Sequence, residues 1–346
     1  MRYDDQDRES SNVEDRRGQG GGGMFRFPGG FGRGRSGGGG RRVQIPFPMG
    51  RGSGRGGFSI TTLIIIGVVM WFLGFNPLKL LTGGGPGGGG VPDVSQMPQM
   101  PKFDQPNREA RRSGGGLQIP TSRNAPANRP ARPDDQLVTF TKRVLADTED
   151  VWNRVFKSFG RQYKEPNLVI FSGTTRTACG LGQSAMGPFY CPLDQKIYID
   201  MRFYQELHRK FRAPGDFAQA YVVAHEVGHH VQKLLGIADK VLQLKQRYPS
   251  SANKIQVRME LQADCLSGVW ANLNDQLHNR LEPGDIEEGL NAANAIGDDM
   301  IQKRQQGYVV PDAFTHGTAE QRVRWFSNGY KSGRMDVCDT FNAKQL

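Results

Sequence analysis

The longest apolar stretch of the chain runs over residues 58–75 and carries no charged side chain. Its length matches a minimal transmembrane helix of about 18 residues, so we expect it to cross a bilayer once. A signal peptide would begin nearer the start of the chain and end at a small-residue cleavage site, whereas a long hydrophilic segment precedes this stretch. A buried core helix is the other alternative, but glycine-rich tracts on both sides leave no neighbouring segment to pack against it.

Periodic patterns in the second half of the chain predict several helices and two short strands. Residues 137–159 repeat apolar side chains at helical spacing, which predicts an amphipathic packing helix. The stretches 167–173 and 195–200 are short and rich in β-branched residues, which predicts strands. Further helices are expected over residues 216–235, 251–272, 283–305 and 318–328. The predicted fold class is therefore α+β, predominantly helical with a small β-sheet.

Glycine and proline divide the chain into parts. The chain has 46 glycines and 20 prolines among its 346 residues, and most of the glycines lie before Leu117. Segments so poor in apolar side chains bury too little surface to offset the entropy of ordering them. We therefore expect four parts: a disordered Gly/Arg-rich tail over 1–57, a membrane helix over 58–75, a flexible Gly/Pro-rich linker over 76–135 and one folded domain over 136–346.

The distribution of positive charge predicts how the chain would cross a membrane. The formal net charge is +11, and Arg41, Arg42, Arg51 and Arg55 precede the apolar stretch, whereas only Lys79 follows shortly after it. Positive residues favour the cytoplasmic side, so we expect a cytoplasmic N-terminus and an exported folded domain. The Gly/Arg-rich tract also resembles RNA-binding low-complexity segments, which leaves an RNA or anionic-lipid binder as an alternative.

One motif carries a recognisable chemistry. The segment AYVVAHEVGHHVQ contains His225, Glu226 and His229 as an H-E-x-x-H motif on a predicted helix. Histidines four residues apart share a helical face and can bind one zinc ion, and Glu226 lies where it can act as the general base. Zinc at such a site lowers the pKa of a bound water toward neutrality, which serves peptide hydrolysis. A chance match is the alternative, but the small apolar neighbours predict a buried helix, where these polar residues are costly without a metal.

The third zinc ligand has a candidate on the next predicted helix. Catalytic zinc sites have three protein ligands and an open position. Glu260 and Asp264 share a helical face at i, i+4 spacing. Glu260 is the candidate ligand, and Asp264 is placed to accept the ring N–H of a ligating histidine. A solvated acidic face is the alternative, although apolar residues surround both positions. His230 points elsewhere on its helix, and we assign it to packing or to the surroundings of the ligands.

Four segments together resemble the bacterial neutral zinc metallopeptidase family. They are AHEVGHHVQ, ELQADCLSGVWA, CPLDQKIYID and FTHGTAEQRVRWFSNG, and the resemblance spans residues 163–328. The basic N-terminus and single apolar anchor also fit this family. We therefore expect a single-pass protein of the bacterial inner membrane, with its N-terminus cytoplasmic and its catalytic domain periplasmic.

The resemblance implies a zincin-like fold and assigns roles to individual residues. In it, His225, His229 and Glu260 bind zinc. Glu226 is the base, and Asp264 supports the site. The implied activity is that of a zinc metallopeptidase acting on a peptide or protein substrate. We expect an endopeptidase, although no residue marks a side-chain pocket that would decide between internal and terminal cleavage.

Other residues near the motif are candidates for substrate contacts. His316, in FTHGTAEQR, lies just before the last predicted helix and could hydrogen-bond the oxyanion of a tetrahedral intermediate. An ordinary loop histidine is an equal alternative. Tyr308 and Arg322 are further candidates for the oxyanion contact. By analogy of fold, the strand over 196–200 forms the edge of the sheet above the active-site helix, where an extended peptide could pair with it.

The chain has four cysteines, Cys179, Cys191, Cys265 and Cys338. An even number in an exported domain indicates disulfides. We favour pairing Cys179 with Cys191, which bracket a glycine-rich loop between two strands, and Cys265 with Cys338. Buried free thiols and a second metal site are the alternatives, but no C-x-x-C spacing supports the metal site.

Three functional classes follow from these patterns. The first is a membrane-anchored zinc-dependent peptidase that hydrolyses peptide bonds with metal-activated water. The second is a catalytically inactive zinc-binding scaffold of the cell envelope. The third acts through the Gly/Arg-rich tail, but we do not expect nucleic acid to be the partner. Substrate specificity and oligomeric state are left open by the sequence.

Overall fold

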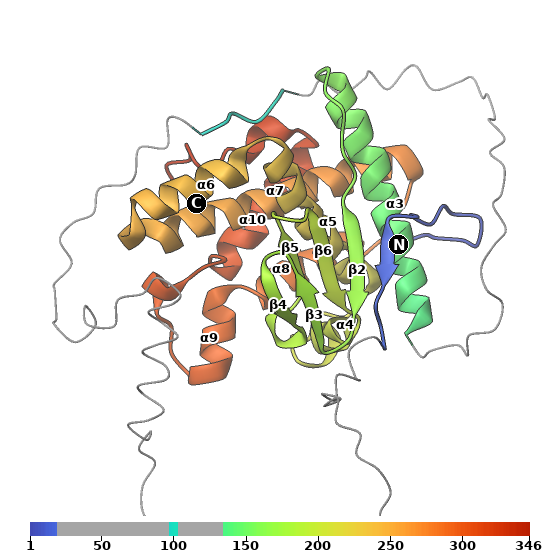
Figure 1. The fold of residues 1–346 in the computed structure, drawn as a ribbon, viewed down its shortest axis with the longest axis horizontal. Helices are drawn as coiled ribbons and strands as arrows, with labels where there is room; N and C mark the ends of the chain where they lie inside the picture. The colour runs from blue at the N-terminus through green and yellow to red at the C-terminus, as the bar shows by residue number, and fades with distance from the viewer. Residues whose placement is uncertain (19–96, 103–133) are drawn as a thin grey trace, which may run out of the picture. The chain divides into compact units, whose positions relative to one another are not determined.

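The computed structural model describes residues 1–18, 97–102 and 134–346, and places a small sheet against a group of helices (Figure 1). The α+β class with a helical majority agrees with the prediction. Within the described ranges, no helix combines the length and the apolar character needed to cross a membrane. The membrane helix predicted over 58–75 lies outside them.

Four of the predicted helices are present, with ends that differ from the expected ones by up to six residues. They are α3 (Asp135–Ser158), α5 (Asp216–Leu234), α7 (Ala252–His278) and α10 (Ala319–Ser332). The single helix predicted over 283–305 is two helices, α8 (Asp285–Ala295) and α9 (Asp298–Gln306). Gly297 lies at the break, where an added Cβ would overlap the backbone of Ala319. The sequence patterns missed α4 (Arg202–Arg209) and α6 (Ile237–Arg247).

The main sheet has four strands in the order β1-β2-β6-β5. They are β1 (Val13–Asp15), β2 (Asn167–Phe171), β6 (Lys196–Asp200) and β5 (Phe189–Cys191). β1 and β6 both run parallel to β2, whereas β5 is antiparallel to β6. A separate hairpin joins β3 (Thr174–Thr177) to β4 (Gly180–Gln183).

The prediction that residues 196–200 form the sheet edge is wrong. β6 has β2 on one side and β5 on the other, so its backbone groups are already paired. β5, with only three residues, is too short to show a period in the sequence, and it is the strand at this edge of the sheet. Any strand addition at this edge would therefore involve β5.

Residues 1–18 are part of the folded domain, which corrects the prediction of a disordered tail over 1–57. Val13 to Asp15 form β1, in register with Leu168 to Ile170 of β2. The Tyr3 hydroxyl donates to the Asp147 carboxylate at 2.9 Å. The Arg17 guanidinium lies 2.8 Å from Asp134. Residues 19–57 lie outside the described ranges.

A short piece of the predicted linker also packs on the domain. Residues 97–102 fall within the linker expected over 76–135, yet the side chains of Met97 and Met100 are buried in the hydrophobic core. These two methionines bury enough apolar surface to favour docking of their segment. The linker prediction was therefore wrong for this segment, and the rest of 76–133 lies outside the described ranges.

Helices α5, α7 and α10 pack closely and hold the centre of the molecule. Gly268 of α7 faces the Phe326 backbone of α10, and Gly329 of α10 faces the Cys265 carbonyl of α7. An added Cβ at either glycine would overlap those backbone atoms. Phe217 of α5 packs against Phe326 with ring centroids 6.3 Å apart. The close contact fixes α7 relative to its neighbours, and α7 carries part of the site described below.

Both disulfides favoured from the sequence are present. Cys179, in the turn of the β3–β4 hairpin, pairs with Cys191 of β5, and their Cα atoms are 5.9 Å apart. Cys265 of α7 pairs with Cys338 in the short 3-10 turn Met335–Cys338, with Cα atoms 5.5 Å apart. No free cysteine occurs, so the alternatives of free thiols and a cysteine metal site are excluded.

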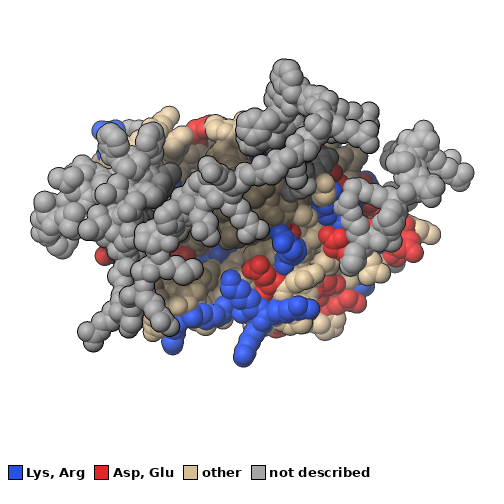
Figure 2. All heavy atoms as spheres, turned by 60° about the horizontal axis from the view of Figure 1, so that its bottom comes forward, with Lys and Arg blue, Asp and Glu red and all other residues tan. Residues whose placement is uncertain are grey.

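The surface of the described domain carries both signs of charge. Figure 2 shows Lys and Arg side chains together with Asp and Glu side chains on the uncovered part of one face. The arginines of the Gly/Arg-rich tract, on which an RNA-binding interpretation depends, lie outside the described ranges. The positive net charge of the whole chain therefore says little about the surface of this domain.

Candidate metal centre

Two neighbouring helices supply the side chains that the motif predicted. α5 carries His225, Glu226 and His229, and α7 carries Glu260 and Asp264. All five side chains are buried. The helices approach closely because α5 has a glycine at position 228, where an added Cβ would lie only 3.1 Å from the Ala263 carbonyl oxygen. This contact brings the two helices close enough for Glu260 to reach both histidines.

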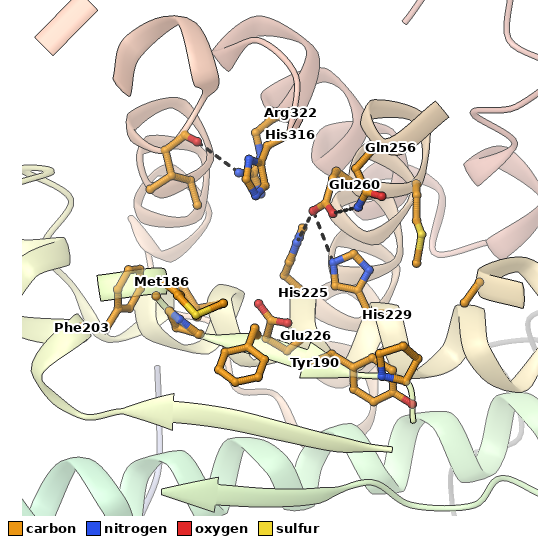
Figure 3. Close-up of a pocket in the computed structure, with 18 of the residues that line it drawn as sticks. Met186, Tyr190, Phe203, His225, Glu226, His229, Gln256, Glu260, His316 and Arg322 are labelled. Carbon is orange, nitrogen blue, oxygen red and sulfur yellow. Dashed lines mark hydrogen bonds and ion pairs between the residues drawn. The ribbon is translucent and has the colours of Figure 1, made fainter. Parts of the chain in front are cut away.

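His225, His229 and Glu260 converge on one point (Figure 3). Their candidate ligand atoms all lie within 4.8 Å of one another. Nε2 of His225 and Nε2 of His229 each lie 3.3 Å from the same carboxylate oxygen of Glu260. Two imidazole nitrogens and one carboxylate oxygen are a donor set that zinc prefers, and a fourth position is left to a water or a substrate.

Asp264 fixes the ring of His225. Its carboxylate oxygen Oδ1 lies 2.8 Å from His225 Nδ1, and an ionised carboxylate can only accept, so Nδ1 carries the proton. In the neutral ring the lone pair of His225 is therefore on Nε2, the atom that faces Glu260. Burial would lower the pKa of His225, but Asp264 and Glu260 outweigh it and raise that pKa to about 9, so a metal would have to displace a proton from Nε2. Arg322 donates to both oxygens of Asp264 at 2.9 Å, and the Tyr221 hydroxyl donates to Oδ1. Arg322 thus neutralises a buried carboxylate that would otherwise be costly.

A glutamine fixes the ring of His229 in the same sense. Gln232 Nε2 donates to the Met259 carbonyl at 2.8 Å and to Gln262 Oε1 at 3.0 Å, so Gln232 Oε1 is left to face His229. It accepts from His229 Nδ1 at 2.9 Å. The free lone pair of His229 is therefore also on Nε2, as zinc binding through that atom requires.

Glu260 has a supporting contact of its own. Gln256, one turn earlier on α7, donates to Glu260 Oε1 at 2.6 Å. Lys245 of α6 in turn donates to Gln256 Oε1 at 2.7 Å, which orients the amide. Oε1 of Glu260 is thus held by the protein, and Oε2 faces the two histidines.

Ionisation in the site follows from burial and neighbouring charge. Burial alone would raise the pKa of Glu260, but His229 and His225 outweigh it and hold that pKa well below its ordinary value. Burial would also raise the pKa of Asp264, but Arg322 and His225 outweigh it and lower that pKa to about 2. Both carboxylates are therefore ionised near neutral pH, as ligands and acceptors should be.

Glu226 differs from Glu260 in its surroundings. Within the described part of the chain, its carboxylate makes no hydrogen bond or ion pair, and it faces the cavity beside the two histidines (Figure 3). Burial is the largest influence on it and raises its pKa above the ordinary value. The two glutamates of the site are thus distinguished by their contacts: one is held by partners, and the other is free to exchange a proton.

His316 lies on the wall of the same cavity, close to Arg322 (Figure 3). Its Nδ1 lies 3.2 Å from Asp298 Oδ1, and its backbone N–H donates to the same carboxylate at 2.6 Å. Burial would lower the pKa of His316, but the carboxylates of Asp298 and Glu260 outweigh that effect and raise it. The imidazole is half exposed to the cavity and can act as a cationic donor there.

The other two candidates for the oxyanion contact have different positions. Tyr308 is 63% exposed and does not line the cavity, so the structure gives no support for a role there. Arg322 lines the cavity, but its donors are engaged by Asp264, Tyr221 and the Ile296 carbonyl. Arg322 therefore acts on Asp264 rather than on a substrate.

His230 is a packing residue, which is one of the two roles expected for it. It is fully buried, and its Nε2 donates to the Lys164 carbonyl at 2.6 Å. Its Nδ1 accepts from the Tyr190 hydroxyl at 3.0 Å, which ties α5 to β5. Burial lowers the pKa of His230 to about 4, so the ring stays neutral and is not available for acid catalysis near neutral pH.

The ligand set opens into a cavity of about 580 Å³. One wall comes from the chain before and within β5, another from α6, and a third from α4 and the chain after α8. Apolar side chains form much of the lining, among them Met186, Phe203, Phe211, Val222 and Leu242. A cavity of this size and composition can hold several residues of a peptide.

Four residues of the site were not singled out by sequence reasoning. Gln232 stands three residues after His229, and Gln256 stands four before Glu260, so helical spacing was a usable signal for both. Tyr221 also stands four residues before His225. Asp298 could not have been found in this way, because it begins α9, whereas His316 lies in the loop before α10, and the two meet only in the fold.

The family model described as "Putative neutral zinc metallopeptidase" matches residues 1–341. The chain belongs to this neutral zinc metallopeptidase family. Membership extends to the N-terminal segment that forms β1 and implies zinc as the metal of the His225, His229 and Glu260 group. The segments that suggested the family from the sequence were therefore read correctly.

Relatives of this chain occur in Escherichia coli and Mycobacterium tuberculosis. The Escherichia coli (strain K12) protein named "Uncharacterized protein YpfJ" is 44% identical over 335 residues, which cover 96% of each chain. The Mycobacterium tuberculosis (strain H37Rv) protein named "Uncharacterized protein Rv2575" is 44% identical over 214 residues, covering 59% of this chain and 71% of that protein. No solved structure matches this chain.

Proposed function

We propose that this member of the neutral zinc metallopeptidase family is an active peptidase that hydrolyses internal peptide bonds. The observation that carries the proposal is the free carboxylate of Glu226. A site that only stores a metal needs ligands and their supports, which His225, His229 and Glu260 and their partners supply. Glu226 adds a buried carboxylate beside these ligands that makes no hydrogen bond or ion pair with the described residues, and this is the group that a hydrolytic site requires.

The ligands and their supports would hold zinc with one open position. When bound, zinc supplies a Lewis acid that polarises a carbonyl and acidifies a water molecule. His225 and His229 present Nε2 because Asp264 and Gln232 occupy the Nδ1 protons. The protein thus fixes both ring orientations before a metal arrives, which reduces the cost of assembling the site.

Glu226 is the proposed general base and acid. Its raised pKa brings it nearer to neutral pH, where a carboxylate can take a proton from water and return it to the leaving amine. Its carboxylate faces the cavity rather than another side chain, so the proton has a path in both directions.

His316 is the proposed donor to the oxyanion. Asp298 accepts from its backbone N–H and lies beside its Nδ1, which orients Nε2 away from Asp298. A cationic imidazole at the cavity wall would stabilise the negative charge that develops on the scissile carbonyl oxygen. This assigns His316 a catalytic role and Asp298 a positioning role.

The substrate is proposed to be an extended peptide or protein segment. β5 is the edge strand of the sheet, and Phe189 and Tyr190 of β5 line the cavity. A peptide that pairs with this edge would be recognised through its main chain. Main-chain pairing requires no free terminus, which supports internal cleavage.

An oxidising compartment is the proposed location of the catalytic domain. The support is the pair of disulfides, Cys179–Cys191 and Cys265–Cys338, which persist outside the reducing cytosol. For a bacterial protein, this supports a periplasmic location of the domain. Anchoring by residues 58–75 stays a prediction from the sequence.

The test combines metal content with turnover. We expect the purified full chain to hold one zinc ion and to cleave unstructured peptides supplied as a mixture. Mass spectrometry would identify the products. Glu226→Gln should keep the zinc and lose cleavage by a factor of about 10² or more, because the proton acceptor is gone. His225→Ala and Glu260→Ala should lose the zinc. Glu287→Gln, an exposed glutamate on α8, is the matched control and should behave as wild type.

The outcomes separate the peptidase from the scaffold. A wild-type chain that binds zinc and cleaves nothing, with Glu226→Gln indistinguishable from it, would support the inactive scaffold instead. A chain that binds no zinc would overturn both.

A further inference from the structure

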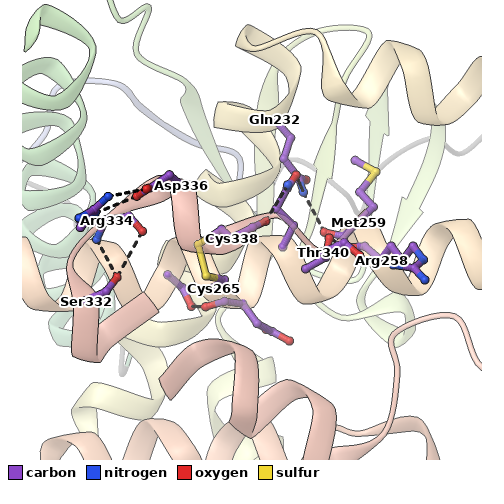
Figure 4. Close-up of a disulfide and its surroundings, with 12 residues drawn as sticks. Gln232, Arg258, Met259, Cys265, Ser332, Arg334, Asp336, Cys338 and Thr340 are labelled. Carbon is purple, nitrogen blue, oxygen red and sulfur yellow. Dashed lines mark hydrogen bonds and ion pairs between the residues drawn. A yellow bond between two sulfur atoms is a disulfide. The ribbon is translucent and has the colours of Figure 1, made fainter. Parts of the chain in front are cut away.

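The last described segment of the chain is docked across α7 at several points (Figure 4). Cys338 is bonded to Cys265, and the side chains of Cys338 and Thr340 are fully buried. The Thr340 hydroxyl donates to the Arg258 carbonyl at 2.6 Å. The Arg258 guanidinium donates in turn to the carbonyls of Thr340 and Phe341. We call residues 335–343 the C-terminal strap.

A chain of buried hydrogen bonds runs from the strap to a proposed zinc ligand. Gln262 Nε2 donates to the Cys338 carbonyl at 2.9 Å. Gln262 Oε1 accepts from Gln232 Nε2 at 3.0 Å, and Gln232 Oε1 accepts from His229 Nδ1 at 2.9 Å. Both glutamine side chains are buried. Figure 4 shows Gln232 on the same side of the strap as Met259, with the disulfide farther along the strap.

The Cys338 carbonyl directs the Gln262 amide, and Gln262 together with the Met259 carbonyl directs the Gln232 amide. The Cys338 carbonyl can only accept, so it draws the NH₂ group of Gln262 and leaves Gln262 Oε1 facing Gln232. Gln232 then points its NH₂ group at Gln262 and at the Met259 carbonyl, and its oxygen at His229. If the Cys338 carbonyl moved away, the Gln262 amide could turn over, and the Gln232 amide would be held by the Met259 carbonyl alone.

We propose that the C-terminal strap, pinned by the Cys265–Cys338 disulfide, sets the zinc affinity of the site through this chain. Gln262 and Gln232 are positioning residues: they hold the His229 proton on Nδ1 and keep Nε2 free for the metal. The inference rests on the proposed zinc site. Its physical basis is that groups which orient a metal-bound histidine change affinity by about 10–100-fold when they are removed.

The experiment measures zinc affinity of the full chain by competition with a chromogenic chelator. Two changes interrupt the chain at different points: Gln262→Met, which keeps the volume but not the hydrogen bonds, and Cys265→Ala with Cys338→Ala, which frees the strap. Each should weaken zinc binding about 10-fold or more. Cys179→Ala with Cys191→Ala removes the other disulfide, which touches no ligand, and should change affinity less than about 2-fold.

Combining the two changes distinguishes a positioning role from general destabilisation. If the strap acts through Gln262, removing the disulfide in the Gln262→Met chain should cost no further affinity, because the link is already broken. Losses that multiply, or either change leaving affinity at the wild-type value, would overturn the proposal. Gln262→Met keeps both disulfides, so it remains informative if the cysteine variant fails to fold. A wild-type chain without zinc would overturn this proposal together with the proposed function.

A second inference concerns the compartment of the N-terminal segment, and it depends on different contacts. The Arg16 N–H donates to the Ile170 carbonyl at 2.7 Å, and the Leu168 N–H donates to the Asn12 carbonyl at 2.8 Å. These two bonds flank the pairing of β1 with β2, in which Val13 to Asp15 lie in register with Leu168 to Ile170. The Arg8 guanidinium also lies 2.8 Å from the buried Glu149 carboxylate of α3. The segment over 1–18 is thus held by main-chain and side-chain contacts along much of its length.

Segments that share a sheet must lie on the same side of a membrane. The arrangement expected from charge asymmetry places residues 1–57 in the cytoplasm and 136–346 beyond a bilayer about 30 Å thick. Hydrogen bonds of less than 3 Å between β1 and β2 exclude that separation for residues 1–18. We infer that residues 1–18 and 134–346 occupy one compartment.

Labelling of single cysteines in cells tests this inference. Asp5→Cys lies on the N-terminal segment and Lys254→Cys on α7, and both positions are exposed in the structure. The native cysteines are paired and do not react. The two variants are treated, in bacterial spheroplasts and after lysis, with a maleimide that does not cross membranes. Equal labelling of the two sites in spheroplasts, whether both react or neither does, is expected. Labelling of one site in spheroplasts and of the other only after lysis would overturn the inference.

Discussion

Asp264 is the residue on which most contacts of the candidate metal centre meet. It accepts from the Tyr221 hydroxyl at 2.5 Å, from His225 Nδ1 at 2.8 Å and from Arg322 at 2.9 Å. These donors come from α5 and α10, so the carboxylate links three helices as well as orienting one ring. A buried carboxylate with a buried guanidinium is tolerable only while both remain paired.

Asp264→Asn should therefore weaken zinc binding without removing any ligand. The amide is uncharged, a poorer acceptor for His225, and leaves Arg322 without its countercharge, so we expect affinity to fall about 10–100-fold. Chelator competition on the purified chain measures the change. Asp275→Asn, the same replacement farther along α7, is the matched control. Unchanged affinity in Asp264→Asn would show that the orientation of His225 does not depend on this contact.

Asp200 predicts a dependence of stability on pH that is separate from the metal. Burial would raise its pKa, but hydrogen bonds from Arg202, Ser184 and backbone N–H groups lower it from 3.8 to about 2. Because the folded pKa lies below the unfolded one, this stabilisation is present above about pH 4 and is lost as the pH falls toward 2. The partner guanidinium is exposed to solvent, so we expect a contribution of only about 1 kcal/mol.

Urea unfolding of wild type and Asp200→Asn measures that contribution. A chelator is kept in both samples so that loss of zinc at low pH does not enter the comparison. The difference in unfolding free energy between the two proteins should be largest near pH 7 and should shrink between pH 4 and pH 2. A difference that grows as the pH falls would contradict the assignment. Asp312→Asn, an exposed position in the turn before α10, is the control.

The residues with chemical roles could be read from the sequence, whereas their supports mostly could not. His225, Glu226, His229 and Glu260 were identified because helical spacing fixes which side chains share a face. Asp298 was missed because its partner, His316, belongs to another part of the chain. Spacing along one helix is visible in a sequence, but contacts between separate elements depend on the fold.

Elements with a strong period were also predicted well, and elements without one were missed. α5 and α3 carry long apolar repeats, and each lies within two residues of its predicted ends. β5 and β1 have three residues each, which is too few for a period to be seen. β1 has a further difficulty: it lies before a Gly/Arg-rich tract, and its partner β2 begins more than 150 residues later.

The contact between α7 and α10 depends on two glycines and gives a prediction at the scale of elements. Gly329 faces the Cys265 carbonyl with no space for a Cβ. Gly329→Ala should push α10 away from α7 and lower the unfolding free energy by about 1–3 kcal/mol. Asn328→Ala, at the exposed neighbouring position on α10, is the control. Urea unfolding measures both variants, and equal stability would show that the helices can separate at little cost.

At the scale of the molecule, the N-terminal segment completes the catalytic domain from a distance in sequence. β1 covers the edge of β2 that would otherwise expose unpaired backbone groups. Arg17 adds ion pairs with Asp134 and Asp135, at the start of α3. A domain defined only by the composition boundary near residue 136 would lack this strand. The match of the family model to residues 1–341 is consistent with a domain that includes it.

Removing that strand should have a measurable cost. We expect a fragment of residues 97–346, which keeps Met97 and Met100 but lacks β1, to unfold at a lower temperature than the full chain and to associate through the exposed edge of β2. A synthetic peptide of residues 1–18 should raise the unfolding temperature of the fragment and suppress its association. The same peptide with Glu14→Pro, which removes the β1 N–H that alternation with Asn12 and Arg16 directs at β2, should do so less well. The contrary outcome is a fragment as stable as the full chain, with an unfolding temperature that the peptide does not change. In that case β1 contributes nothing to the domain, and the inference that the two segments share a compartment loses its structural basis.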